Sequence, residues 1–131
     1  MLACIVALVA MGGWAGCSDD GSAEQLCDRL GDGRSFQATV EGFDPTDTDN
    51  ALEQLRAARV QLGELREVAP GEVRDDLSVE IDYVQALIEA MEEVGPNDPT
   101  EAVDAARRIT AEHPDVQQAA DRLEAWAETT C

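Results

Sequence analysis

The chain has 131 residues and a net charge of −19, because 28 acidic side chains oppose nine arginines and no lysine. Such a charge repels phosphate, so binding to a nucleic-acid backbone is excluded, and it is typical of a protein kept soluble by like-charge repulsion. The length suits one small domain with a modest core and leaves no room for a second.

The first element is an apolar, uncharged run at residues 2–15, which leads into Gly16 and Cys17. A short apolar segment that ends in small residues is typical of a secretory signal peptide. A cysteine directly behind it is what a lipoprotein peptidase requires, because the thiol is acylated before cleavage. We therefore expect lipid on Cys17 to hold the protein at the outer face of the cytoplasmic membrane. The chain then divides into a lipoprotein signal peptide (1–16), a lipidated tether (17–22) and a helical bundle domain (23–131).

Two features of the leader depart from the lipoprotein pattern. No Lys or Arg precedes the apolar run, and bulky Trp14 stands three positions before Cys17, where an aliphatic residue is usual. A start codon upstream of Met1 would account for the missing basic end. Two other interpretations stay open: secretion without lipid, and an uncleaved anchor, although the run is shorter than the roughly 20 residues that cross a bilayer.

The four cysteines fall into three roles. Cys4 leaves with the leader and Cys17 takes the lipid, which leaves Cys27 and Cys131 for each other. Export places this pair in an oxidising compartment, and its spacing matches no zinc or redox motif. We expect a disulfide that closes a loop of about 105 residues, worth about 4.7 kcal/mol in the chain-entropy model.

Helical patterns begin after the tether. A capping box at residues 22–25 starts a first helix, and the glycines at 31 and 33 favour a break, with continuation to Phe43 left open. Phe36, Val40 and Phe43 could cover the core after that break. The polar segment 44–50 leads into a second helix at 52–69. Its expected core stripe is Leu52, Leu55, Arg59, Leu62, Leu65 and Ala69, with Glu53, Arg56, Glu64 and Glu67 in water.

The clearest helical pattern lies at residues 73–94, where apolar side chains recur at spacings of three, four and seven. Gly95 and Pro96 end this third helix. Its expected core positions are Val73, Leu77, Ile81, Val84, Leu87, Ile88, Met91 and Val94.

The last part of the chain contains two shorter helices. Asp98 is the expected N-cap of the fourth, with Pro99 at its first position, and His113 and Pro114 interrupt it. A fifth begins near Asp115 and continues to the end of the chain. Because the connections are short and no β pattern competes, we expect an all-α fold: a small antiparallel bundle of four to five helices, its first and last helices joined by the disulfide.

The strongest candidate for a metal site is the acidic group Asp44, Asp47 and Asp49, since Ca²⁺ prefers closely spaced oxygen ligands. Its spacing does not fit an EF-hand loop that starts at Asp47, because Leu52 stands where glycine is needed and Ala58 where glutamate is needed. Helix capping is the favoured interpretation of these side chains.

Other candidate residues have structural interpretations. His113 is the only histidine and lies next to a proline without a partner for a metal or a catalytic triad, so we interpret it as a turn residue. Trp126 fits the apolar stripe of the last helix, with a protein-contact anchor as the alternative. Arg107 and Arg108 balance local charge. The sequence indicates no cofactor, no catalytic residue and no small-molecule substrate.

The lipidation site at residues 15–17, the acidic lysine-free helices and the bracketing pair Cys27 and Cys131 together resemble the small, uncharacterised helical lipoproteins of high-GC Gram-positive bacteria. The resemblance implies an envelope location and no activity. We therefore expect a non-enzymatic, membrane-anchored accessory or protein-binding module, its partner another envelope protein. The alternative is a Ca²⁺-binding or ion-buffering protein. An enzyme would need a concave pocket with at least two convergent titratable side chains.

Overall fold

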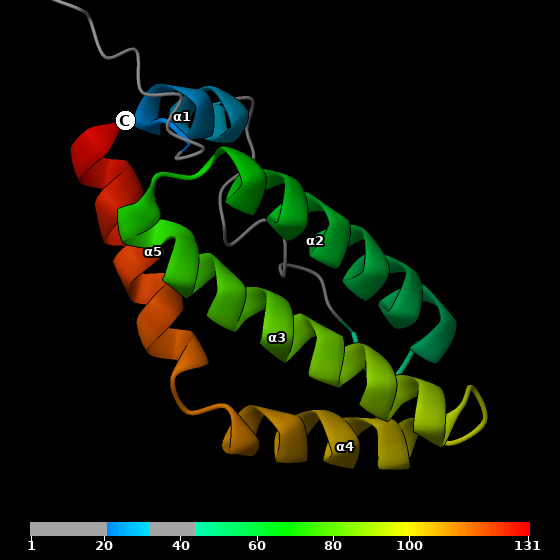
Figure 1. The fold of residues 1–131 in the computed structure, drawn as a ribbon. Helices are drawn as coiled ribbons and strands as arrows, with labels where there is room; N and C mark the ends of the chain where they lie inside the picture. The colour runs from blue at the N-terminus through cyan, green and yellow to red at the C-terminus, as the bar shows by residue number, and fades with distance from the viewer. Residues whose placement is uncertain (1–20, 32–43) are drawn as a thin grey trace, which may run out of the picture.

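The computed structural model describes residues 21–31 and 44–131. The leader, Cys17 and the positions of Phe36, Val40 and Phe43 lie outside the described residues. The described chain forms five helices and no strand, as Figure 1 shows: α1 (Ala23–Gly31), α2 (Thr48–Val68), α3 (Gly71–Val94), α4 (Pro99–Glu112) and α5 (Val116–Thr130). The expected all-α antiparallel bundle is confirmed. None of these helices is both long enough and apolar enough to cross a bilayer.

Helix α3 is the centre of the bundle. Helix α2 runs antiparallel along one side of it, while α4 and α5 together cover another side (Figure 1). The chain turns between Glu112 and Val116, so that α4 lies along the C-terminal half of α3 and α5 along its N-terminal half. Helices α4 and α5, with the corner between them, thus cover a side of α3 that a single long helix could otherwise cover.

Local sequence signals fix the helix ends. The side chain of Asp47 accepts a hydrogen bond from the Asn50 N–H at 3.3 Å, and Asp98 accepts one from the Glu101 N–H at 3.0 Å. Both carboxylates satisfy donors that a helix N-terminus leaves free. Gly95 ends α3 at φ +75°, a left-handed conformation that glycine adopts without strain. The expected caps and stops of α2, α3 and α4 are therefore present.

The buried face of α2 differs from the expected stripe at two positions. Arg59 is exposed and Leu52 only partly buried, whereas Ala51 and Ala58 are buried to 1% and 3% relative exposure. The buried residues still recur at helical spacing, but the stripe is rotated toward the alanines. Both alanines belong to the hydrophobic core, in which α2 packs against α3. The prediction that Arg59 belongs to the core stripe was wrong.

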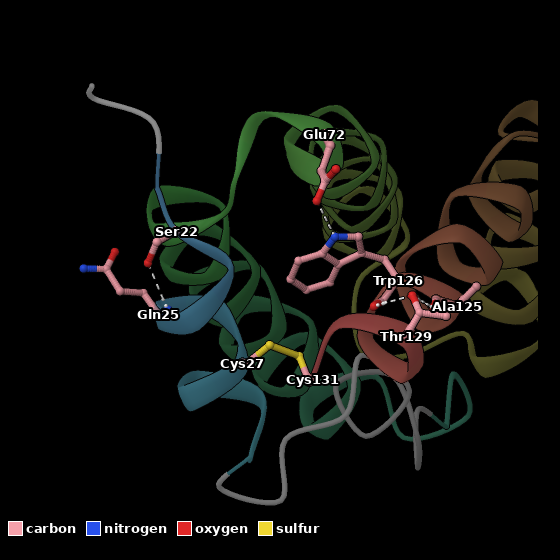
Figure 2. Close-up of a disulfide and its surroundings, with 8 residues drawn as sticks. All are labelled: Ser22, Gln25, Cys27, Glu72, Ala125, Trp126, Thr129 and Cys131. Atoms are coloured by element: carbon pink, nitrogen blue, oxygen red, sulfur yellow. Dashed lines mark hydrogen bonds between the residues drawn. A yellow bond between two sulfur atoms is a disulfide. The ribbon is translucent and has the colours of Figure 1, made fainter. Parts of the chain in front are cut away.

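Helix α1 lies across one end of the bundle, against α2 and α5. Leu26 is fully buried there, and the Cys27–Cys131 disulfide joins α1 to the end of α5 with a Cα–Cα distance of 5.4 Å (Figure 2). Ser22 accepts the N–H of Gln25 at 3.1 Å, which is one of the two bonds of a capping box. Gly21 lies so close to the α2–α3 turn that a Cβ atom there would come within 2.1 Å of the Val68 carbonyl oxygen.

Candidate functional site

A cavity of about 530 Å³ opens where α2, α3 and the α4–α5 corner meet. Its volume falls in the range of small-molecule binding sites, and its lining is mainly apolar. The described residues that line it include Leu55 on α2, Glu80, Tyr83 and Leu87 on α3, Thr110 and His113 at the end of α4, and Val116 and Ala120 on α5. Residues from four helices therefore converge on one space.

The α4–α5 corner shapes one wall of this cavity. His113 ends α4, donating its N–H to the Ile109 carbonyl at 3.1 Å, and its backbone leaves the helical conformation at φ −117° and ψ 64°. Pro114 requires this change, because a residue before proline is pushed out of the helical region. His113 is thus the expected turn residue, but it also lines the cavity. Its ring meets the Tyr83 ring edge-on, with the centroids 5.7 Å apart.

The Tyr83 hydroxyl is oriented by the neighbouring helix. Its oxygen lies 2.8 Å from the Thr110 Oγ1 atom, and Thr110 Oγ1 in turn lies 2.9 Å from the Ala106 carbonyl oxygen. A carbonyl only accepts and a hydroxyl has one proton, so Thr110 donates to Ala106 and Tyr83 donates to Thr110. The Tyr83 oxygen can therefore only accept a further hydrogen bond.

Glu80 is the chemically unusual residue of the cavity. Its Oε1 atom is buried and has no hydrogen-bond partner among the described residues. Buried polar atoms are normally paired, so an unpaired carboxyl oxygen is an exception. Burial disfavours the charged form and raises the pKa of Glu80 to about 7, and the negative charge of Asp76 adds to this shift.

Asp76 lies one turn before Glu80 on α3, but its environment is different. The Arg122 Nε atom on α5 donates to both carboxylate oxygens of Asp76, at 3.0 and 3.1 Å. The side chain of Asp76 is only 14% exposed, and its hydrogen bond and charge raise the pKa of Arg122. Arg122, the cation on α5 near Glu80 in the fold, is thus paired with Asp76.

Of the three acidic residues proposed from the sequence, Asp47 is a helix cap, while Asp44 and Asp49 have other positions. Asp47 caps α2, and the Asp44 carboxylate accepts from the Thr46 hydroxyl at 2.6 Å and the Thr46 N–H at 2.9 Å, which lowers the pKa of Asp44. Asp49 is exposed in the first turn of α2. Within residues 21–31 and 44–131, no group of three or more His, Cys, Asp or Glu side chains could hold a metal ion.

Trp126 contacts the core, as its apolar stripe predicts, and is partly buried. Its indole Nε1 donates to the Glu72 carboxylate at 2.6 Å, which links α5 to the start of α3 (Figure 2). Indole N–H groups at the edge of a core usually find such a partner. Arg107 lies 3.5 Å from Asp104, a local ion pair between exposed side chains on α4. Neither residue lines the cavity.

Sequence reasoning did not select Glu80, although a signal was present. Positions 73, 77, 80, 84, 87 and 91 alternate at spacings of four and three, which is the pattern of residues along one helix face. The residues there are Val, Leu, Glu, Val, Leu and Met. Glu80 is therefore a single acid within an otherwise apolar face, while the stripe predicted from the sequence passed through Ile81 instead.

Comparison of the chain with protein-family models, with curated proteins and with solved structures found no match. Because a helical bundle supports many unrelated activities, the fold alone does not indicate a function. The function is therefore argued from the site.

Proposed function

We propose that the chain is a lipid-anchored, non-enzymatic binding module of the cell envelope, displayed at the outer face of the cytoplasmic membrane by acyl chains on Cys17. The observation that carries this proposal is the disulfide between Cys27 and Cys131, which are 104 positions apart. Such bonds persist in oxidising compartments and are rare in the cytosol. The disulfide thus supports export, and the sequence at 15–17 supplies the means of attachment.

The anchor would hold the bundle close to the bilayer. Gly21 already lies against the α2–α3 turn, so four chain steps separate it from Cys17. At 3.3 to 3.6 Å per residue these steps span at most about 14 Å. A protein of charge −19 is repelled by anionic headgroups, so the lipid and not the protein surface would provide the attachment.

The cavity supports binding over catalysis. It does bring together titratable side chains, which an enzyme would need. However, Tyr83 donates its proton to Thr110, and the buried Oε1 atom of Glu80 is hydrogen-bonded to no described residue. A nucleophile and its base are normally within hydrogen-bonding distance of one another, and the described residues contain no such pair here. Cys27 and Cys131, the cysteines of the described chain, are already joined to each other.

A concave site also agrees better with the described surface than a flat protein-binding patch. Val60 is the one large apolar side chain that the described residues leave exposed, at 62%. A single exposed apolar residue is normal on a soluble protein, whereas protein-binding sites usually present a contiguous patch. The cavity is therefore the binding site that we assign to this module.

The anchor is tested by the intact mass of the protein recovered from the membrane fraction of its host, measured with and without reduction and alkylation. We expect a chain that starts at Cys17 and carries an acylglycerol, with two thiols alkylated only after reduction. A Cys17→Ser variant should keep its leader and lack the lipid mass. A wild-type protein that retains Met1, or that is recovered unlipidated from the soluble fraction, would contradict the proposal.

A further inference from the structure

We propose that the cavity binds a small amphiphilic amine, with a compact apolar body against Leu55, Leu87 and Val116 and a protonated ammonium group on the Glu80 carboxylate. This inference rests on the proposed role of the chain as a binding module, and it does not depend on the lipid anchor.

The apolar walls determine the body of the ligand. Leu55 and Leu87 are buried core residues that also line the cavity. Val116 and Ala120 on α5 line it as well. Burial of ligand CH₂ groups against such a surface is favourable, because apolar surface leaves water. A cavity of about 530 Å³ suits a molecule with one ring or a short branched chain.

Glu80 is the acidic side chain among the described residues that line the cavity, and the other polar side chains there are amides, hydroxyls and one imidazole. Glu80 places a carboxyl group in the lining, and its buried Oε1 atom has no hydrogen-bond donor among the described residues. A bound ammonium group donates up to three hydrogen bonds and also neutralises the carboxylate. A ligand carboxylate or phosphate would instead meet the like charge of the ionised Glu80 carboxylate.

The charge of the whole protein favours the same ligand class. The net charge of −19 raises the local concentration of cations and lowers that of anions. Near the cavity, Arg122 would be the competing cation, but it is paired with Asp76. The site therefore combines long-range attraction for cations with one uncompensated carboxyl group.

Binding of an ammonium group should release a proton. Glu80 holds its proton up to a pKa of about 7, whereas the complex needs the ionised carboxylate. Asp76 on α3 is the charged group that acts on Glu80, and Arg122 on α5 is hydrogen-bonded to Asp76. Tyr83 on α3, His113 at the end of α4 and uncharged Gln54 on α2 line the same cavity. Because about one tenth of Glu80 is ionised one unit below its pKa, affinity should fall roughly tenfold between about pH 8 and about pH 6.

The test uses the mature chain (17–131) with its disulfide formed, whose described core lies within α1 to α5. Three probes share one apolar body and differ in their head: 4-phenylbutylammonium, 4-phenylbutanol and 4-phenylbutyrate. Isothermal titration calorimetry gives affinity and proton release, and amide NMR shifts locate the site. We expect the ammonium probe to bind with a Kd of about 1 mM or tighter, the alcohol more weakly and the carboxylate not at all.

Three variants separate the contributions. Glu80→Gln should weaken the ammonium probe roughly tenfold, leave the alcohol unchanged and abolish proton release. Glu93→Gln removes the same charge from an exposed position on α3 and should change none of these values. Ala120→Leu fills part of the cavity and should weaken both the ammonium and the alcohol. Recovery of the ammonium probe with unchanged mass distinguishes binding from turnover.

The proposal is overturned if the ammonium probe shows no saturable binding, or if its NMR shifts map away from the cavity. It is also overturned if the alcohol binds as tightly as the ammonium, or if Glu80→Gln and Glu93→Gln weaken binding equally, since bulk charge would then explain the result. Chemical conversion of the probe would contradict the non-enzymatic role itself. None of these outcomes affects the mass measurement that tests the anchor.

Discussion

Asp76 and Glu80 lie one helical turn apart on α3, yet only Asp76 is held by a cation. Arg122 reaches across from α5 and forms two hydrogen bonds to the Asp76 carboxylate, whereas the buried Oε1 atom of Glu80 has no partner among the described residues. Glu80 lines the cavity, whereas Asp76 is not among its lining residues. This difference makes Glu80 the residue whose protonation most directly tests the site.

Glu80→Gln should stabilise the protein at high pH and change little at low pH. The folded-state pKa of Glu80 is raised from 4.5 to about 7, so the folded protein keeps a proton that the unfolded chain loses. The contribution of Glu80 to stability is therefore fully present below about pH 4.5 and is lost as the pH rises through about 7. Allowing for solvent screening of a partly exposed group, the variant should gain about 1–2 kcal/mol at about pH 8.

Urea unfolding of wild type and Glu80→Gln across this pH range measures the effect. The other carboxylates contribute equally to both proteins, so the difference between the two curves isolates Glu80. A difference that stays constant from about pH 4.5 to about pH 8 would show that Glu80 titrates as an ordinary exposed acid.

Substitutions at Asp76 and Arg122 should move the Glu80 titration in opposite directions. Asp76→Asn removes a negative charge that raises the Glu80 pKa, so the pKa should fall. Arg122→Gln removes the cation that Asp76 pairs with, so the pKa of Glu80 should rise. A carboxyl ¹³C NMR titration of each variant measures the midpoint, and equal midpoints in both would contradict the electrostatic account.

Loss of the disulfide should loosen α1 before the rest of the bundle. Helix α1 is connected to its neighbours by buried Leu26, the exposed Arg29–Glu64 ion pair at 3.6 Å and the Cys27–Cys131 bond. A Cys27→Ser, Cys131→Ser double variant should lose up to about 4.7 kcal/mol of unfolding free energy. Hydrogen exchange should rise most in α1, and equal protection of α1 and α3 would contradict this prediction.

Gly21 packs against the α2–α3 turn, and Gly63 within α2 offers a matched control. Gly21→Ala places a Cβ atom within 2.1 Å of the Val68 carbonyl oxygen and should destabilise the protein by about 1–3 kcal/mol. Gly63→Ala meets nothing within 4 Å in the middle of α2 and should stabilise it by about 0.5–1 kcal/mol. Thermal unfolding of both variants gives the comparison, and equal effects would show that Gly21 does not contact the turn.

Much of the fold could be predicted from the sequence, because the signals that set helix ends are local. Asp98 and Pro99 begin α4 where expected, and Gly95 ends α3, since caps and glycine stops depend on a few neighbouring atoms. The disulfide followed from the count of cysteines. The rotation of α2 could not be predicted, because Ala58 and Arg59 are adjacent and contact with α3 selects between them.

The candidate site could not be predicted in the same way. The cavity is lined by residues from α2, α3, α4, α5 and the corner at His113 and Pro114, and no local sequence pattern encodes how these segments meet. Glu80 is one of 28 acids, and only its position in the apolar face of α3 distinguishes it. An interruption of one helix face by a single acid is the sequence signal that leads to this site.

The most direct test of the account is a ¹³C NMR titration of the Glu80 carboxyl in the disulfide-bonded mature chain, with and without 4-phenylbutylammonium. The account predicts a midpoint at a pKa of about 7 for the free protein and a lower midpoint with the amine bound, because the ammonium stabilises the carboxylate. A midpoint at 4.5, the ordinary value for glutamate, that the amine does not move would contradict both the buried carboxyl and its role in binding.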